Sequence, residues 1–405
     1  MTIAPDEHDI ETTGDNVQQF DRSALESLKR PGTATQSVSP ALRRDAVGRA
    51  RSEVTTPALI LDLDLARRNI AEMARRMQDL PAGLRPHVKV HKSPTLARMQ
   101  IEAGAIGVAT ATVWEAEVMA RAGVADVLVA NQVVGRERIA TLAGAARLTR
   151  VTVAVDDARN LDDLAAAAAA AGCTIGVLIE VDVGMGRSGV RSAADATRLA
   201  AQAARLPGID PRGVMGYEGH CMMEPNRALR VAKARAAMES LLAVVDHLAA
   251  DGFESPVVSA GGTGTYDITG ANPRVTEIQA GSYIFMDAFH GSLVPDFAVA
   301  LTVAATVLSR HGRLVVLDAG RKAVGADLTM PRLAAHEGSL VFLHEEHSGF
   351  DVAEDCALRV GDTVELVTGY GPTTVNMYEA YHVVSDGAVV DLWPVEARGY
   401  GRLTF

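Results

Sequence analysis

The sequence predicts an α/β protein in which a (β/α)8 barrel of the TIM type is followed by a C-terminal all-β domain. Strand-like and helix-like segments alternate from about residue 56 to residue 298, and repeated units of this kind form right-handed parallel crossovers. Eight of these strands are the number that a closed barrel needs. After residue 298 the segments are short, β-branched and bounded by Gly, Asp or Pro, which is typical of a separate β domain.

Each barrel element follows from a local pattern. The apolar segment 58–64 precedes the eight barrel strands and is surplus to them, so it is expected to pair with the β domain, and Asp64 can cap a helix over 65–77. Apolar residues at three- and four-residue spacing predict the later helices, as at 114–122, 161–171 and 194–206. The barrel strands are expected at 84–90, 107–112, 126–131, 150–155, 174–183, 212–218, 256–260 and 277–280.

Four regions result from this assignment. Residues 1–50 are polar and aperiodic and are expected to form a disordered N-terminal arm. Residues 51–83 hold the first strand and helix, 84–298 the barrel and 299–405 the β domain. Strands of that domain are expected at 297–309, 313–318, 339–344, 363–368, 380–385 and 388–393, with a hairpin turn at 385–387.

Composition excludes several classes of function. Among 405 residues, 39 basic and 50 acidic side chains give a net charge of −11, and no basic run is present, so neither a nucleic acid nor an anionic membrane is an expected partner. No apolar segment is long enough to span a membrane. The three scattered cysteines and the lack of a signal-peptide pattern favour a reducing, cytoplasmic location.

Two glycine-bearing loops stand where barrels often bind phosphate, after the seventh and eighth strands. The seventh strand leads into GGTGT at residues 261–265, and the eighth leads into GSY at 281–283. Because glycine has no side chain, the backbone N–H groups of such loops can approach an anion closely. The pair of loops therefore predicts a ligand that carries a phosphate, whereas either loop alone would be an ordinary turn.

The first barrel strand carries a lysine that is expected to point into the barrel mouth. Alternation along the strand places His87, Lys89 and His91 on one face. Lys92 falls in the turn, because Ser93 and the proline after it begin a helix. Burying a charged lysine in the mouth costs free energy unless the amine has an ionic partner or takes part in the chemistry. Desolvation also lowers the pKa of the amine, as Schiff-base chemistry requires. Opposite a phosphate site, Lys89 predicts pyridoxal phosphate (PLP) as the cofactor; the alternative is a solvated lysine at a strand end.

Other motifs are weaker. Residues 184–189 form a GxGxxG that could bind a dinucleotide, but it follows the fifth strand of a series instead of opening a βαβ pair. Arg187 within it is a candidate anion contact. At the sixth-strand exit, Tyr217 and His220 could donate hydrogen bonds or transfer protons. The HEEH at 344–347 is too short for a zincin motif.

Eight segments together carry a family resemblance: TPALILDLD, RPHVKVHK, VDVGMGRSGV, GYEGH, SAGGTGTYD, QAGSYIFMDA, LDAGRKA and the C-terminal run TTVNMYEAY with DGAVVDLWPVEARG. From about residue 56 to 402 the chain resembles the D-threonine aldolase and D-serine dehydratase family of PLP enzymes, which have an alanine-racemase-like barrel. The resemblance implies that Lys89 forms the Schiff base, that Gln279 faces the pyridine nitrogen, and that the family's homodimer closes each barrel mouth with the partner's β domain. It implies further cofactor contacts from His87, Arg187, Tyr217, Gly261, Gly262, Thr263, Gly281, Ser282 and Tyr283.

One departure from the family concerns its divalent metal. Relatives carry a His-x-Cys or His-x-Asp pair just before the TTVN-like segment, and this pair binds the ion. Here Tyr370 and Pro372 occupy the two ligand positions. A proline side chain has no donor atom and a phenol is a poor Zn²⁺ ligand, so we expect no metal site.

Three hypotheses about the reaction remain. The first is a metal-independent lyase that cleaves or dehydrates a D-3-hydroxy amino acid, with Tyr370, His347 or His220 as the base on the hydroxyl. The second is a racemase or epimerase that uses Lys89 and Tyr370 on opposite faces of Cα. The third is a PLP carrier without catalytic activity. In each case the partner is a small amino acid.

Overall fold

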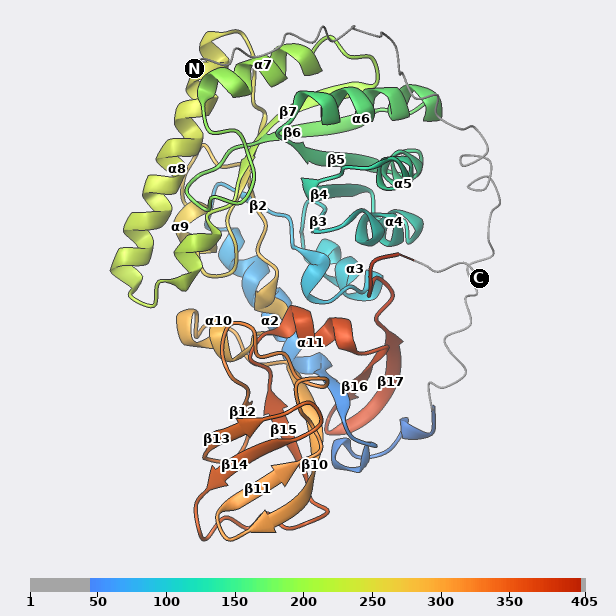
Figure 1. Cartoon of the computed structure of the whole chain (residues 1–405), viewed down its shortest axis with the longest axis vertical. Coiled ribbons are helices and arrows are strands. Elements are labelled where there is room, and N and C mark those ends of the chain that lie inside the picture. Colours follow the sequence, from blue (N-terminus) through green and yellow to red (C-terminus); the bar gives the residue numbers. More distant parts are fainter. Residues whose placement is uncertain (1–43, 402–405) are drawn as a thin grey trace, which may run out of the picture.

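The computed structural model describes residues 44–401 and contains two separate sheets (Figure 1). The larger part is a curled sheet of eight parallel strands with helices on its outside, and a second sheet of nine strands lies at the other end of the molecule. The predicted fold class, a barrel with a C-terminal β domain, is confirmed. No helix in residues 44–401 is both long and apolar enough to cross a membrane.

The barrel strands follow one another in the order β2-β9-β8-β7-β6-β5-β4-β3. Their bounds are β2 Gly83–Leu84, β3 Val108–Thr110, β4 Asp126–Gln132, β5 Arg150–Val155, β6 Ile175–Glu180, β7 Ile209–Gly216, β8 Val257–Ala260 and β9 Glu277–Ile278. The two edges also meet, because Ile106 N donates to Leu84 O at 2.9 Å and Ala109 N donates to Pro86 O at 2.9 Å. The carboxyl ends of all eight strands therefore surround one mouth.

Helices accompany the strands of this sheet, and α4 to α8 contact the strands directly. The helices are α2 Leu63–Met77, α3 Pro94–Glu102, α4 Val113–Arg121, α5 Arg136–Ala146, α6 Ala158–Ala171, α7 Ala193–Ala203, α8 Arg227–Ala250, α9 Tyr266–Thr269 and α10 Ala288–Leu293. The predicted cap of α2 is wrong by two residues. Asp62 is the N-cap and accepts from Leu65 N at 3.0 Å, whereas Asp64 accepts a hydrogen bond from Ser385.

The predicted first barrel strand is largely wrong. Only its start is a strand, and Val88–Val90 form a 3-10 helix. Pro86 lacks the N–H that a strand ladder uses, and the Nδ1 atom of His87 accepts from the backbone N of Lys89 at 3.4 Å, which turns the chain. The following helix begins as predicted, with Ser93 at its N-cap.

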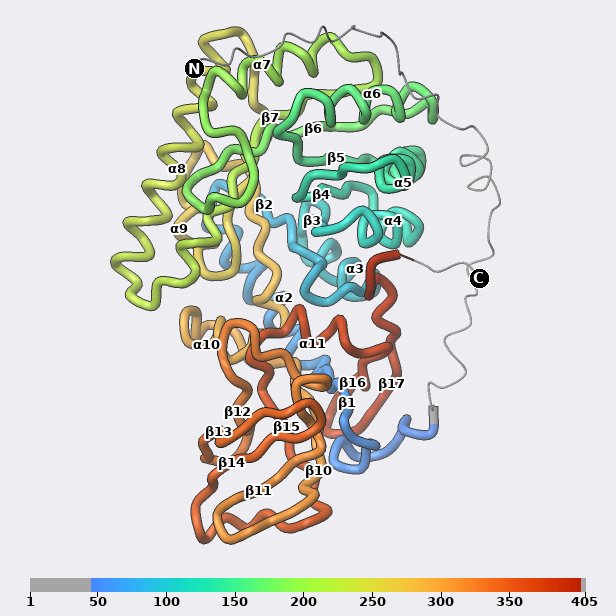
Figure 2. Tube along the Cα trace, in the orientation of Figure 1, coloured from blue at the N-terminus to red at the C-terminus, as the bar shows by residue number. Residues whose placement is uncertain are grey.

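The second sheet has the order β13-β14-β11-β10-β1-β16-β17, with β15 pairing with β10 and β12. Strand β1 lies between β10 and β16, antiparallel to the first and parallel to the second (Figure 2). The elements are β1 Ala58–Asp62, β10 Leu301–His311, β11 Leu314–Leu317, β12 Arg332–Leu333, β13 Gly338–Leu343, β14 Ser348–Val352, β15 Thr363–Val367, β16 Ala380–Ser385, β17 Ala388–Pro394 and the helix α11 Gly371–Met377. Strands β12 and β14 and helix α11 were not predicted.

Of the expected N-terminal arm, residues 1–43 lie outside the described residues. Residues 44–50 pack on β17, where Gly48 N donates to Val389 O at 2.8 Å, so this part of the arm prediction is wrong. One large cluster of buried apolar side chains runs through both sheets and includes Leu59, Val127 and Val303. The shared core holds the second sheet against the barrel, and α11 contacts the 3-10 helix that carries Lys89.

Candidate active site

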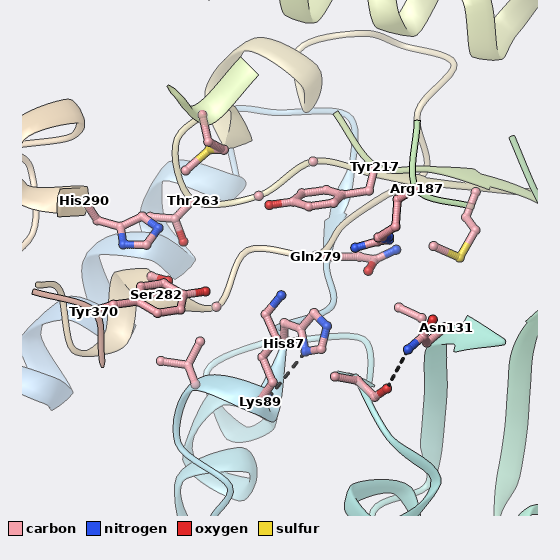
Figure 3. A pocket seen from close by; sticks show the side chains of 18 residues that line it. His87, Lys89, Asn131, Arg187, Tyr217, Thr263, Gln279, Ser282, His290 and Tyr370 are labelled. Carbon is pink, nitrogen blue, oxygen red and sulfur yellow. Dashed lines mark hydrogen bonds between the residues drawn. The ribbon is translucent and has the colours of Figure 1, made fainter. Parts of the chain in front are cut away.

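A pocket opens at the carboxyl ends of the barrel strands, where α10 and α11 approach them (Figure 3). Its space is about 700 Å³, part of it open to solvent, which suits a small organic ligand. Lys89, Arg187, Tyr217 and Gln279 line it from the barrel, and Tyr370 lines it from the N-cap of α11. One chain therefore supplies both sides of the pocket.

Lys89 extends its amino group into this pocket (Figure 3). The Nζ atom lies 5.9 Å from the ring centre of Tyr217, and Lys89 forms no salt bridge within residues 44–401. Burial lowers the pKa of Lys89, and the nearby guanidinium of Arg187 lowers it further against the opposing effect of Glu115. The amine is thus more readily deprotonated than an exposed lysine, which makes it a better nucleophile.

The two predicted glycine loops face the same pocket, and their glycines are needed for space. A Cβ on Gly281 would lie 2.6 Å from the backbone oxygen of His87, and one on Gly262 would lie 3.2 Å from the Tyr217 ring. Gly261 has a φ of 79°, which an L side chain rarely adopts. The loops can approach the Tyr217 ring and the backbone of His87 only because these side chains are absent.

Backbone donors in these loops are available to a ligand. Within residues 44–401, the N–H groups of Thr263, Gly281 and Ser282 donate to no acceptor. The hydroxyl oxygen of Thr263 accepts from Tyr283 N at 3.2 Å and so ties the two loops together. Three unpaired N–H groups around a space next to Lys89 form a place for an anion such as a phosphate.

A buried carboxylate that the sequence analysis missed holds the first loop. Glu218 has no exposed surface and accepts from Gly261 N at 3.0 Å, from the Thr265 hydroxyl at 2.8 Å and from the Thr269 hydroxyl at 2.6 Å. Glu218 follows β7 and lies behind the loop instead of in the pocket. In the sequence, Glu218 is visible as an acidic residue directly after a barrel strand. Hydrophobic patterning, however, does not reveal which groups donate hydrogen bonds to its carboxylate.

Two residues next to the loops differ in their position. Gln279 lines the pocket, and its Nε2 atom donates to the Ser259 hydroxyl at 2.8 Å. Tyr283 does not line the pocket, and its phenol accepts from Gln100 Nε2 at 2.8 Å, so its contact with the cofactor stays a prediction. Burial raises the pKa of Tyr283 well above its ordinary range.

Positive and aromatic groups surround Lys89. The Arg187 guanidinium lies 5.8 Å from the ring centre of Tyr217 and approaches Glu180 at 3.4 Å. Burial raises the pKa of Tyr217, and burial together with the charge of Lys89 holds the pKa of His87 well below its usual range. The Arg187 guanidinium is therefore the cationic group beside Lys89 that can contact an anionic ligand.

The GxGxxG segment is not a dinucleotide loop. The carboxylate of Asp182 accepts from Gly184 N at 3.1 Å and from Gly186 N at 2.9 Å, so the loop folds around its own aspartate. Helix α7 begins only at Ala193, and the glycine N–H groups do not open a helix as a dinucleotide site requires.

Two histidines expected in the site lie outside it. His220 stands next to Gly184, with its Nε2 atom 3.5 Å from the Cys221 sulfur, and does not line the pocket. His347 is exposed in the turn between β13 and β14. The placement of both in the pocket was wrong, because sequence position near a strand end does not determine the direction of a side chain.

A third histidine, which the sequence analysis did not single out, does line the pocket. His290 on α10 is paired through Nδ1 with Asp287 at 2.8 Å. Its ring stacks on Tyr370, with 6.2 Å between ring centres and 22° between planes. Burial, followed by the charge of Asp287, raises the pKa of Tyr370 to about 12.

Tyr370 and Pro372, at the two positions where the resemblance implied a metal pair, both lie at the start of α11. Neither side chain offers an imidazole, thiolate or carboxylate donor. Across residues 44–401, no group of three or more His, Cys, Asp or Glu side chains is arranged to hold a metal ion. The absence of a metal remains a prediction.

Comparison with known proteins agrees with this architecture. Residues 61–288 match the family described as alanine racemase, N-terminal domain, and residues 300–384 match the putative serine dehydratase domain. The chain is 36% identical to a D-threonine aldolase of an Arthrobacter species (87% of this chain, 94% of the relative) and 36% identical to a 3-hydroxy-D-aspartate aldolase of Paracoccus denitrificans (87% and 95%).

The crystal structure of D-threonine aldolase from Filomicrobium marinum superposes with a TM-score of 0.84 at 36% identity, covering 87% of this chain and 98% of that one. The resemblance inferred from the motifs is therefore confirmed over both domains. The chain belongs to the family of alanine-racemase-like aldolases and dehydratases that includes D-threonine aldolase.

Proposed function

We propose that this protein is a PLP-dependent lyase that cleaves a D-3-hydroxy amino acid without a divalent metal. The observation that carries the proposal is the position of Lys89, which shares one pocket with Thr263, Gly281 and Ser282, whose N–H groups have no acceptor within residues 44–401. Family membership adds the reaction class, since the relatives named above are aldolases of D-3-hydroxy amino acids. Bound in this pocket, PLP would supply an electron sink for negative charge that develops on Cα.

The residues present fit this cofactor. The lowered pKa of Lys89 leaves its amine available for a covalent bond with an aldehyde. The N–H groups of Thr263, Gly281 and Ser282, which donate to no acceptor within residues 44–401, suit the phosphate. Gln279 is neutral and lines the pocket, which suits a contact with an uncharged pyridine nitrogen.

The protein's own groups bind the substrate and exclude water. Arg187 offers a guanidinium at the pocket wall for the substrate carboxylate. Lys89 can return a proton to Cα after the Cα–Cβ bond breaks. Tyr370, at the N-cap of α11, lines the side of the pocket opposite the barrel and limits the access of water from that side.

Racemisation remains a second candidate, because Lys89 and Tyr370 line the same pocket. A racemase needs two bases on opposite faces of Cα. With its pKa raised to about 12, Tyr370 is protonated at neutral pH and must lose its proton before it can act as a base. This favours the lyase. A non-catalytic PLP carrier is the third candidate.

We also propose a cytoplasmic homodimer with the active site at the subunit interface. Met185 and Met223 are exposed large apolar side chains on loops that follow β6 and β7, near the pocket mouth. Exposed apolar groups at such a place favour a contact with a second subunit. Light scattering coupled to gel filtration tests the assembly, and a monomer at micromolar concentration would exclude it.

Proton NMR in D₂O tests the reaction. The PLP-loaded enzyme is incubated with D- and L-3-hydroxy amino acids without added metal, with and without a chelator, and with Lys89→Ala as the control. We expect an aldehyde and glycine from the D substrates in both conditions. Loss of only the α-proton signal would favour the racemase, no change would favour the carrier, and loss of activity on chelation would overturn metal independence.

A further inference from the structure

The imidazole of His290 has one nitrogen held and one nitrogen free. Its Nδ1 atom lies 2.8 Å from Asp287 Oδ1 and 3.0 Å from Oδ2. Because a carboxylate only accepts hydrogen bonds, Nδ1 carries a proton, and in the neutral imidazole the lone pair is then on Nε2. Among residues 44–401, Nε2 has no hydrogen-bond partner, although the side chain is only 7% exposed and lines the pocket.

Asp287 is itself fixed on three sides. It is 1% exposed, accepts from His290 N at 2.7 Å as the N-cap of α10, and accepts from Gly371 N of α11 at 3.0 Å. An N-cap needs only the backbone N–H at this position, so capping does not explain an imidazole that lines the pocket. The stacking of the ring on Tyr370 further limits its rotation (Figure 3).

The other groups near the pocket are poor acceptors for a hydroxyl proton. Tyr370 has a pKa raised to about 12, and His220 and His347 lie outside the pocket. The Nδ1 atom of His87 already accepts from the backbone of Lys89. The two positions at which relatives bind a metal are a tyrosine and a proline, so no donor set there activates the hydroxyl.

We propose that His290, oriented by Asp287, is the general base that takes the proton from the 3-hydroxyl of the substrate. This inference rests on the proposed lyase function and assigns its missing catalytic residue. The O–H proton passes to Nε2, the O–H bonding pair becomes the second bond of the carbonyl, and the Cα–Cβ bond breaks. Its electron pair is left on Cα, which then takes up one proton, so the products are an aldehyde and the shortened amino acid.

The test compares His290→Asn with wild type on two reactions of the same PLP-loaded protein. Asparagine can still donate to Asp287 but offers no base. We expect cleavage of the D-3-hydroxy substrate to fall by about 10²- to 10⁴-fold. Exchange of the α-proton of D-alanine in D₂O needs no hydroxyl base and is expected to stay near the wild-type rate. His247→Asn is the matched control, since His247 forms a surface pair with Asp251 at 3.6 Å.

Two readouts do not depend on cleavage. The absorbance spectrum and PLP affinity of His290→Asn should match wild type, which excludes a folding defect. In ¹⁵N-histidine NMR of the cofactor-free protein, His290 should show the Nδ1–H form, and Asp287→Asn should weaken that preference. Added imidazole should restore part of the cleavage by His290→Ala, which a purely structural histidine would not permit.

The outcomes are distinguishable. If wild type cleaves no 3-hydroxy amino acid, both the proposed lyase function and the proposed role of His290 are wrong. If wild type cleaves and His290→Asn cleaves at the same rate, the lyase stands and the base is another group. If His290→Asn loses α-proton exchange and cleavage together, His290 serves the cofactor or the substrate in general, and the specific role as hydroxyl base is wrong.

Discussion

Removing the charge of Glu218 tests whether the loop behind the proposed phosphate site is held by this one side chain. The carboxylate has no exposed surface and accepts three hydrogen bonds from the loop and the turn that follows it. In Glu218→Gln, one oxygen can still accept from Gly261 N, but an amide NH₂ then faces the hydroxyls of Thr265 and Thr269. These hydroxyls already donate toward that position, so at least one strong hydrogen bond is lost.

The magnitude follows from the kind of bond removed. A hydrogen bond to a charged group contributes about 1.5–3 kcal/mol. If this free energy is lost from the conformation of the loop that binds PLP, the affinity for PLP falls by about 10- to 100-fold, because 1.4 kcal/mol corresponds to a factor of ten. Since Glu218 does not line the pocket, the chemistry after binding should change little, and saturating PLP should restore most of kcat.

Titration of the cofactor-free protein with PLP, followed by absorbance, measures the affinity, and urea unfolding measures the free energy of unfolding. Glu239→Gln on the exposed side of α8 is the matched control. Wild-type PLP affinity together with a wild-type unfolding midpoint in Glu218→Gln would show that the three hydrogen bonds do not hold the loop.

Three further changes test other parts of the structure. Burial lowers the pKa of His91 to about 4, so the folded state binds fewer protons than the unfolded state between pH 4 and 6.5. The free energy of unfolding is therefore highest above this pH range and is about 3 kcal/mol lower below it. In urea unfolding measured at several pH values, His91→Gln should lack this loss. Glu115→Gln breaks the buried pair with Lys92, at 2.5 Å, and should cost about 3–5 kcal/mol in urea unfolding. Gly281→Ala drives a Cβ against a backbone oxygen and should lower both PLP affinity and, by about 1–3 kcal/mol, stability, whereas Gly291→Ala meets open space and should leave stability nearly unchanged in thermal unfolding.

The sequence predicted best where one local rule determines the outcome. The loops at 261–265 and 281–283 follow buried strands directly, and close backbone approach requires glycine there. Lys89 was assigned to the pocket correctly but for a wrong reason, because alternation along a strand does not apply to the 3-10 helix that carries it. A proline and a histidine acceptor broke the strand, and hydrophobic periodicity registers neither effect.

Prediction failed where distant segments meet. The role of His290 depends on its carboxylate partner Asp287 and on Gly371, which is 84 positions further along the chain. Nothing in the local sequence of α10 indicates that α11 will pack beside it. His220 and His347 stood in plausible local contexts, yet the packing of the folded chain directs both away from the pocket.

The place of β1 in the second sheet has a consequence during synthesis on the ribosome. Its two neighbours, β10 and β16, emerge only after the whole barrel, so β1 stays without a partner while roughly 240 residues are made, which at about 5–20 residues per second takes some tens of seconds. The strand ALILD is apolar and would form an open edge in that interval. Nascent chains that stall after the barrel therefore expose a site for aggregation or chaperone binding. Strand β1 is paired on both edges only after β16 has been synthesised.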